Sequence, residues 1–408
     1  MELLFWASVA LIAYVYVGYP ALLAVWAWLA GAPDVSAQGF GERRAEAWPG
    51  VSVVIAARNE ARRLPARIEN LLSSDYPQDR MQIIVASDGS TDGTIEALAP
   101  YASRVELIML PPGGKARALN AAVSRARHPI LVFADARQRF APDAIRRLVR
   151  HFTRLSVGAV SGELVLDCEQ SMRADLKVGP YADNAADADN AGAAGRATSS
   201  SVEADLQVGP RSTIGDGIGA YWKYEKWLRG HEAAVGSTLG VTGAVYAMRR
   251  GLWEPLPPET ILDDVLTPMR IVLRRYRVIV DRTALAFDEA AADAAAETRR
   301  KVRTLAGNFQ LLGLEPRLLV PGVNPVWLQF MSHKIGRLVV PYALVALFVA
   351  SAALATTWWG YATAFAAQAV FYGLAAYGAC LDRAARVTPA TSPNGANYAG
   401  VVKRHEAA

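Results

Sequence analysis

Two stretches decide the fold: Ile83-Ile84-Val85-Ala86-Ser87-Asp88 and Ile130-Leu131-Val132-Phe133-Ala134-Asp135. Each is a short aliphatic run that ends at an aspartate, and such runs are typical of buried parallel strands when turn residues bound them. Ligands of open α/β sheets bind beyond the carboxyl ends of parallel strands. Asp88 and Asp135 therefore predict a site for a nucleotide and for the divalent cation that accompanies its diphosphate.

Strands and helical patterns alternate on both sides of these runs. Further strands are predicted at 51–56 and 105–110, and helices at 64–72, from Lys115 and at 142–152. This β-α-β-α order predicts an α/β fold with a doubly wound, mostly parallel sheet.

Composition narrows the class of protein. A chain of 408 residues has room for one sizeable soluble domain plus membrane segments. The excess of 43 Lys and Arg over 38 Asp and Glu suits an anionic membrane surface or phosphates, and is too mild to indicate nucleic acid. Cys168 and Cys380 are too far apart for a disulfide framework, which indicates a reducing compartment.

Three hydrophobic segments predict membrane spans. Residues 3–30 are uncharged and would form a helix of about 42 Å. A cleaved signal peptide is the alternative, but Glu2 and the length of the segment argue against it. Residues 338–357 and 360–381 form a second and a third span, which Trp358 and Trp359 separate.

The basic residues flank these spans on one side only. Arg and Lys follow the first span, precede the second and follow the third, whereas the N-terminus and the Trp358-Trp359 turn carry none. The positive-inside rule then predicts a multi-pass protein of the cell (inner) membrane, with its central region and C-terminal tail cytoplasmic.

Residues 170–211 interrupt the alternation. A seven-residue pattern at 174–180 recurs at 204–210, with a tract of small polar residues between the two copies. Because the tract has little to bury, we expect a disordered insert. A functional acceptor-binding loop is the alternative.

Six short motifs remain, and they follow one another in chain order. They are Ala57-Arg58-Asn59-Glu60, Asp88-Gly89-Ser90-Thr91-Asp92, Gly114-Lys115, Asp135-Ala136-Arg137, Val241-Thr242-Gly243-Ala244 and Leu262-Asp263-Asp264. Their order and spacing resemble glycosyltransferase family 2, the inverting sugar transferases with the GT-A fold. The resemblance covers residues 51 to about 314, and the flanking spans match the membrane-bound synthase branch.

The first motifs are expected to bind the nucleotide sugar. Asp88 can accept hydrogen bonds from the base or ribose, and Asn59 and Glu60 line the same crevice. Lys115 follows two glycines at a helix start, where free N–H groups and a lysine both favour diphosphate. The structural alternatives are an ordinary turn or N-cap residue for Asp88 and a solvated surface lysine for Lys115.

The resemblance implies that Asp135 is the metal ligand. The family's DxD motif has a second acid two residues later, but Arg137 stands there in this sequence. Arg137 is expected to meet phosphate or to face solvent. The cation would rely on Asp135, the diphosphate oxygens and water, and the sequence leaves Mg²⁺ and Mn²⁺ open.

Asp263 and Asp264 match the family's acidic pair, in which the second acid is the general base. Such a base accepts the proton of the acceptor hydroxyl as its oxygen attacks the anomeric carbon. Thr242 and Gly243 are expected at the acceptor end of the site. An exposed helix N-cap is the alternative for the two aspartates.

Residues 299–304 occupy the place of the synthases' QxxRW motif. Arg300 and Arg303 would grip the diphosphate, whereas Thr304 replaces the tryptophan and leaves processivity open. A plain basic helix near the membrane surface is the alternative reading.

The expected organisation is a transmembrane helix (1–31), a linker (32–49), a GT-A domain (50–316) with the insert (170–211), an interfacial segment (317–337), transmembrane helices (338–357 and 360–381) and a cytoplasmic tail (382–408). The expected activity is transfer of a sugar from a uridine-linked donor to a glycan or a lipid-linked acceptor. Transfer to polyprenyl phosphate is a second reading, and a membrane transport or binding protein with a nucleotide-sensing domain is a third.

Overall fold

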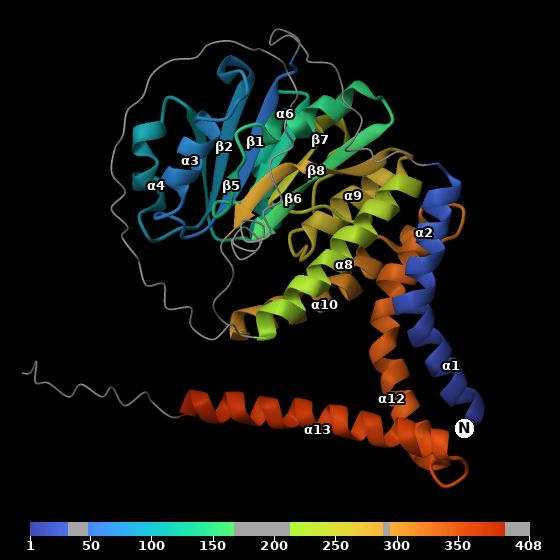
Figure 1. Cartoon of the computed structure of the whole chain (residues 1–408). Coiled ribbons are helices and arrows are strands. Elements are labelled where there is room, and N and C mark those ends of the chain that lie inside the picture. The colour runs from blue at the N-terminus through green and yellow to red at the C-terminus, as the bar shows by residue number, and fades with distance from the viewer. Residues whose placement is uncertain (32–47, 167–212, 289–293, 388–408) are drawn as a thin grey trace, which may run out of the picture. The chain divides into compact units, whose positions relative to one another are not determined.

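The computed structural model describes residues 1–31, 48–166, 213–288 and 294–387 (Figure 1). The chain divides into two compact units, one of Met1–Tyr14 and Val339–Ala408 and one of Val15–Leu338. The predicted insert (170–211) lies outside the described residues, as do nearly all of the predicted linker (32–49) and most of the tail (382–408).

The larger unit is built on one eight-stranded sheet with the order β3-β2-β1-β4-β7-β6-β8-β5. Four of its seven pairings are parallel, and β7 and β5 introduce the antiparallel ones, which confirms the predicted mostly parallel α/β fold. The strands are β1 (Val51–Ala57), β2 (Met81–Asp88), β3 (Val105–Leu110), β4 (Ile130–Ala134), β5 (Arg139–Phe140), β6 (Val157–Leu166), β7 (Val245–Arg249) and β8 (Arg277–Asp288).

The register of the central strands places the two marker aspartates at one edge. Val51 pairs with Met81 of β2 on one side and with Ile130 of β4 on the other, so the three strands run side by side in the same direction. Asp88 is the last residue of β2, and Asp135 directly follows β4. Both carboxylates therefore lie at the carboxyl edge of the parallel part of the sheet.

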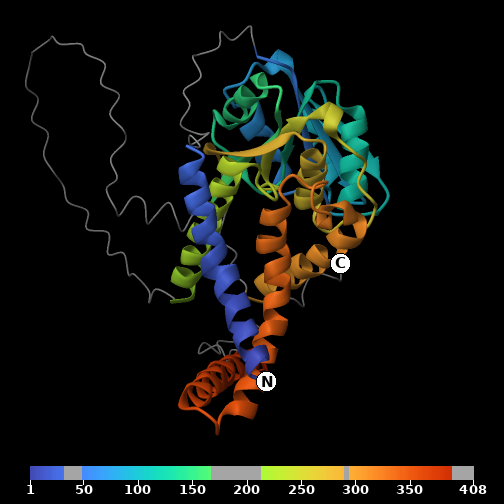
Figure 2. The same cartoon turned by 90° about the vertical axis from the view of Figure 1, so that its right-hand side faces the viewer.

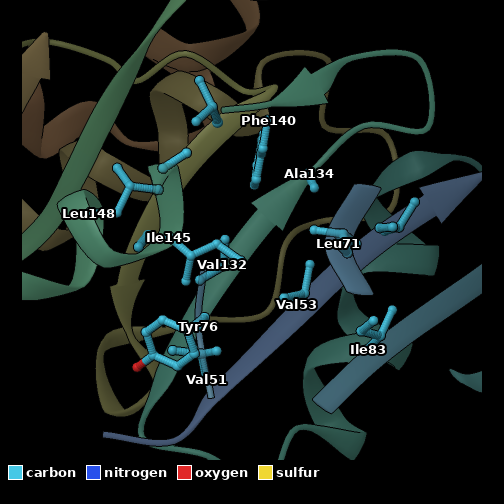
Figure 3. Packing of buried hydrophobic residues seen from close by; sticks show 14 of the residues in the cluster. Val51, Val53, Leu71, Tyr76, Ile83, Val132, Ala134, Phe140, Ile145 and Leu148 are labelled. Carbon is cyan, nitrogen blue, oxygen red and sulfur yellow. The ribbon is translucent and has the colours of Figure 1, made fainter. Parts of the chain in front are cut away.

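The core lies on both faces of this sheet (Figures 1 and 2). On one face α3 (Leu64–Leu72) and α6 (Ala144–Val149) belong to the core cluster that includes Val53 and Val132, and Figure 3 shows Leu71 beside Val53 and Ile145 beside Val132. On the other face α5 (Lys115–Arg125) and α9 (Asp263–Leu273) supply the apolar contacts. Each fully buried aliphatic side chain is worth about 1.5–3 kcal/mol, so these helix starts are held firmly.

The helix predicted at 142–152 is shorter in the structure. It consists of α6 and a 3₁₀ turn, η5 (Arg150–Thr153). The Arg249 guanidinium donates to the carbonyl oxygens of Phe152 and Arg154 at 2.9 Å. These side-chain bonds satisfy the terminal carbonyls that another helical turn would otherwise use, which fits a helix that ends here.

The remaining helices of the larger unit form a second layer of packing. α2 (Tyr19–Leu29) and α8 (Thr213–Val235) lie side by side (Figure 2), and the Tyr19 hydroxyl donates to Glu232 Oε1 at 3.0 Å. His333 Nδ1 lies 2.7 Å from the same oxygen. The other elements are η3 (Gln78–Arg80), α4 (Thr94–Ala97), η4 (Ala99–Tyr101), η6 (Arg250–Leu252), α10 (Ala294–Leu314), η7 (Pro316–Leu319), α11 (Trp327–Gln329) and η8 (Phe330–Ile335).

Three helices are long and apolar enough to cross a membrane: Glu2–Leu29, Trp327–Leu354 and Trp359–Leu381. The first comprises α1 (Glu2–Ala13), a π-helical turn η1 (Tyr14–Gly18) and α2. Pro20 has no N–H to continue the regular ladder, which accounts for the irregular turn before it. The second helix begins at α11, earlier than the predicted start at residue 338. Residues 327–335, which were predicted to be part of an interfacial segment, are helical and lead directly into α12 (Gly336–Leu354).

The smaller unit contains α1, nearly all of α12, and α13 (Trp359–Val387). Aromatic contacts hold these helices together. The rings of Phe5 and Tyr361 meet edge to face at 4.7 Å, and those of Phe348 and Phe365 lie 5.1 Å apart. One N-terminal and two C-terminal apolar helices therefore agree with the three predicted spans.

Candidate active site

Three charged side chains from three elements meet at the carboxyl edge of the sheet. Lys115 begins α5, Asp135 follows β4 and Asp263 begins α9. The Lys115 ammonium lies 3.1 Å from Asp263 Oδ2 and 3.9 Å from Asp135 Oδ1. All three line one small pocket, together with Phe133 and Gly243. The sequence motifs that supply them are far apart in the chain, and the fold brings them into direct contact.

Asp88 fixes the loop from which Lys115 projects. Its Oδ1 accepts hydrogen bonds from the backbone N–H groups of Gly113 at 2.6 Å and Gly114 at 3.0 Å. Gly114 has a φ of 88°, a conformation that glycine adopts without steric cost. Arg58, a residue of the first motif, lies 4.0 Å from the other Asp88 oxygen. The Asp88 carboxylate is therefore engaged with the chain itself, at the strand end where it was predicted to meet the nucleotide.

Asn59 and Glu60 lie in the neighbouring loop. Asn59 has a φ of 56°, and its side-chain oxygen accepts a hydrogen bond from Thr91 N at 2.9 Å. Its own N–H donates to Ser90 Oγ. These bonds tie the loop after β1 to the loop after β2, so the first two motifs form one structure. The Glu60 carboxylate pairs with Arg63 at 3.0 Å.

The loop before β7 packs closely on Asp264. A Cβ added at Gly243 would lie 3.3 Å from the Asp264 Cβ, which is tighter than most side chains tolerate. Val241 N donates to the Asp264 carbonyl oxygen at 2.9 Å, and Thr242 N donates to Ser161 Oγ at 2.9 Å. The motif at 241–244 therefore positions the second aspartate of the acidic pair, as its glycine suggests.

The aspartates of the site stabilise the positive charge of Lys115. Burial works against the charge on Lys115, but Asp263, and after it Asp135 and Asp264, raise the pKa of Lys115 above its usual value. Partial burial also raises the pKa of Asp135, whose side chain is 40% exposed, and Lys115 opposes that rise. For Asp264, burial and then the neighbouring charge of Asp263 raise the pKa. The lysine remains charged, and Asp264 is a stronger base than an exposed aspartate.

Sequence comparisons decide the family of this chain. Residues 52–173 match the family described as "Glycosyl transferase family 2". An N-acetylglucosaminyltransferase of Rhizobium leguminosarum bv. trifolii is 32% identical over 124 residues, which are 29% of this chain and 68% of that protein. The chain belongs to glycosyltransferase family 2.

Other relatives match this glycosyltransferase over shorter parts of their length. A beta-monoglucosyldiacylglycerol synthase of Nostoc sp. is 31% identical over 118 residues, which are 28% of this chain and 25% of that protein. The match thus spans about a quarter of that relative. The mannosyltransferase PcManGT of Pyrobaculum calidifontis, solved in complex with GDP-Man and Mn2+, has a TM-score of 0.59 at 21% identity and covers 90% of this chain and 96% of its own. The predicted GT-A fold and the predicted enzyme class are confirmed.

Arg137 pairs with another side chain of the protein, a contact that was not predicted from the sequence. Its Nη2 donates to Asp288 Oδ2 at 3.1 Å, and Gln138 Nε2 donates to the same oxygen at 2.8 Å. The residue that replaces the second acid of the family's DxD motif therefore ties the loop after β4 to the end of β8. The Arg137 side chain is also 52% exposed to solvent.

Arg300 and Arg303 lie on an exposed half of α10, as residues 298–306 are all exposed. Arg303 Nη2 donates to the carbonyl oxygen of Ile261 at 3.4 Å, and Gly307 packs against Leu262. Within the described part of the chain, no ion pair joins either arginine to the carboxylates around Lys115. The helix therefore adjoins the acidic pair through Ile261 and Leu262, and the two arginines are exposed there.

Arg67 is a buried residue beside the site that sequence reasoning missed. It is 2% exposed, its guanidinium stacks over the Phe140 ring at 3.9 Å, and Nη1 donates to Asn70 Oδ1 at 2.6 Å. Burial lowers the pKa of Arg67 to about 9, and the charge of Asp135 opposes this. In the sequence, the burial of Arg67 is indicated by its position between Leu64 and Ile68 on the apolar face of α3.

Proposed function

We propose that this glycosyltransferase moves a sugar from a nucleoside-diphosphate donor, most simply a uridine-linked one, to a hydroxyl of a glycan or lipid-linked acceptor, with inversion at the anomeric carbon. The observation that carries the proposal is the position of the Lys115 ammonium, which lies 3.1 Å from Asp263 and 3.9 Å from Asp135. Asp264 directly follows Asp263 in the chain. A diphosphate-binding cation and a basic carboxylate are the two groups that a single displacement needs.

The chemistry divides between two residues. The Asp264 carboxylate accepts the proton of the acceptor hydroxyl while that oxygen forms a bond to the anomeric carbon. The bond from this carbon to the diphosphate oxygen breaks on the opposite face, and the leaving nucleoside diphosphate keeps the electron pair. Lys115 stabilises the charge that develops on that oxygen. One displacement inverts the configuration.

Asp88, Asn59 and Glu60 are proposed to line the nucleoside end of the donor site. The Asp88 carboxylate is 5% exposed and already accepts two N–H groups, so its contribution includes holding the Gly113-Gly114 turn in shape. Thr242 and Gly243 are proposed on the acceptor side, because their loop packs on Asp264. Arg300 and Arg303 are proposed as further diphosphate contacts, from the exposed half of α10.

Asp135 fits a divalent cation, Mg²⁺ or Mn²⁺. Its carboxylate is 40% exposed at the sheet edge and already faces a positive group, Lys115 Nζ. No cluster of three or more His, Cys, Asp or Glu side chains suited to a metal is found among the residues described. The cation would therefore be held by Asp135 together with diphosphate oxygens and water, as Mg²⁺ commonly is. When bound, it would neutralise charge on the diphosphate.

Removal of divalent cations tests this proposal directly. Excess chelator should abolish sugar transfer, and added Mg²⁺ or Mn²⁺ should restore it. Asp135→Ala should raise the cation concentration needed for half-maximal activity by at least 10-fold and should weaken calorimetric binding of Mn²⁺ in the presence of uridine diphosphate. Asp79→Ala, an exposed aspartate on η3, is the matched control and should leave both values unchanged. Full transfer in excess chelator would remove the cation from the proposal.

The acceptor class follows from the apolar helices and from the relatives. Three helices suited to a membrane would keep the site near lipid. One relative is named a beta-monoglucosyldiacylglycerol synthase and another, from Staphylococcus epidermidis, a poly-beta-1,6-N-acetyl-D-glucosamine synthase, so the names of similar proteins include a glycolipid and a glycan product. We propose an acceptor of one of these two classes, at the cytoplasmic face of the cell membrane.

The membrane orientation gives a further expected result. In a background with Cys168→Ser and Cys380→Ser, a single cysteine at Asp79 should resist a membrane-impermeant thiol reagent in intact cells. A single cysteine at Trp359 should react, because the Lys and Arg residues lie on the other side of each span. After cell lysis both should react. Labelling of the Asp79 position in intact cells would place the catalytic domain outside the cell.

A further inference from the structure

One buried hydroxyl at the site has no partner. Tyr246 lies on β7, is 1% exposed, and its hydroxyl has no hydrogen-bond partner among the residues that the structure describes. Buried polar groups are nearly always hydrogen-bonded, so an orphaned one calls for an explanation. No sequence motif includes this residue.

The position of the Tyr246 ring is fixed by stacking. β7 runs antiparallel to β4 with Tyr246 opposite Phe133, and the two rings stack at 4.4 Å between centroids with 4° between their planes. Phe133 stacks in turn on Trp253 at 5.4 Å and lines the pocket of Lys115, Asp135 and Asp263. The ring therefore cannot turn to another partner without breaking this stack.

Tyr246 lies in the same buried cluster as Val265 and Leu266 of α9, which directly follow Asp263 and Asp264. The surroundings of the hydroxyl are therefore acidic. Burial, and then the charges of Asp263, Asp264 and Asp135, raise the pKa of Tyr246 well above its usual value. The phenol thus keeps its proton at any physiological pH. A tyrosine hydroxyl has one proton to donate, and a carboxylate is a strong acceptor for it.

Of the three carboxylates, two already have a charged partner and one does not. Asp263 and Asp135 both face the Lys115 ammonium. The Asp264 carboxylate forms no ion pair and no hydrogen bond within the described part of the chain, although its backbone is tied to Val241. Among the described residues, Tyr246 is therefore an unmatched donor of the site and Asp264 an unmatched acceptor.

We propose that the Tyr246 hydroxyl donates a hydrogen bond to the Asp264 carboxylate when donor and acceptor are bound, and so orients the general base. Tyr246 is then a positioning residue, which acts on the reaction through Asp264. A hydrogen bond that forms only in the reactive complex accelerates the chemical step without tightening the binding of the ground state. The inference rests on the proposed function, because it needs Asp264 as the base.

Tyr246→Phe tests the inference, because it deletes the hydroxyl and keeps the stacked ring. We expect kcat to fall roughly 10- to 100-fold, the effect of one hydrogen bond to a charged group, with KM for the sugar nucleotide within about twofold of wild type. The thermal midpoint in detergent should be equal to or above that of wild type, because the deleted hydroxyl has no partner in the resting state. Tyr76→Phe is the matched control. It removes a buried hydroxyl that donates to the Pro49 carbonyl oxygen and should leave kcat unchanged.

A double-mutant cycle separates positioning from packing. In an Asp264→Asn background, Tyr246→Phe should change kcat by less than about twofold, since the residue it orients is already disabled. Wild-type kcat in Tyr246→Phe, full additivity in the cycle, or loss of folded protein would each overturn the inference. A wild-type protein that turns over no sugar nucleotide would instead overturn the proposed function.

Discussion

Asp264→Asn should lower turnover roughly 10²- to 10⁴-fold, the usual contribution of a positioned general base. The amide has nearly the shape of the carboxylate, so the packing of Gly243 against this side chain should survive. Binding of the sugar nucleotide, measured by calorimetry, should change by less than about threefold, because Lys115 and Asp263 remain in contact. The loss should therefore appear in kcat.

The pH dependence of the wild-type enzyme adds a second signature of the same residue. Burial and the charge of Asp263 raise the pKa of Asp264, and only its ionised form accepts a proton. The acidic limb of kcat should therefore lie above the ordinary aspartate value of about 3.9, with activity falling as the pH drops through the raised pKa. Near-normal transfer by Asp264→Asn, alongside an unchanged Asp79→Ala control, would remove Asp264 from the role of base.

Lys115→Met should lower kcat/KM roughly 10³-fold and weaken binding of the nucleoside diphosphate as well. The methionine keeps most of the buried stem and removes the ammonium, which is the only positive group that contacts both Asp135 and Asp263 among the described residues. Without it, two carboxylates would face an incoming diphosphate, and the leaving group would lose its preorganised cation. The effect on product and donor binding distinguishes this residue from Asp264.

Two variants make the lysine test specific. Lys115→Arg keeps the charge in a wider, planar group and should recover part of the activity. Lys223→Met removes an exposed lysine of α8 and should behave as wild type. Equal kcat/KM in Lys115→Met and wild type would show that the lysine only joins two carboxylates in the folded protein.

The parallel half of the sheet could be predicted from the sequence, because its strands are continuous apolar runs. The predicted strands at 105–110 and 130–134 have the bounds of β3 and β4, Asp88 ends β2, and Asp135 directly follows β4. The order of the strands in the mixed half of the sheet could not be predicted from such runs. β7 and β8 join strands that are distant in the chain, and no local pattern states which edge accepts them.

The site shows the same division. The motifs identified Lys115, Asp135 and Asp263, since a helix start, a strand end and an acidic pair each have a local signature. The partners of Arg137 and Arg67 depend on tertiary contacts, such as the ion pair between Arg137 and Asp288, which are separated by 151 positions. Tyr246 has no signature at all, because an aromatic residue in a buried strand reads as core.

The most direct test of the central claim is the release of nucleoside diphosphate by the purified full-length protein in detergent. A panel of sugar nucleotides would be offered with a divalent cation, each with and without a membrane lipid extract as the source of acceptor. We expect one sugar nucleotide to be turned over in an acceptor-dependent reaction that chelator stops and Asp264→Asn nearly abolishes. No release of nucleoside diphosphate from any sugar nucleotide, by protein that is folded and supplied with acceptor, would contradict the assignment of this site to sugar transfer.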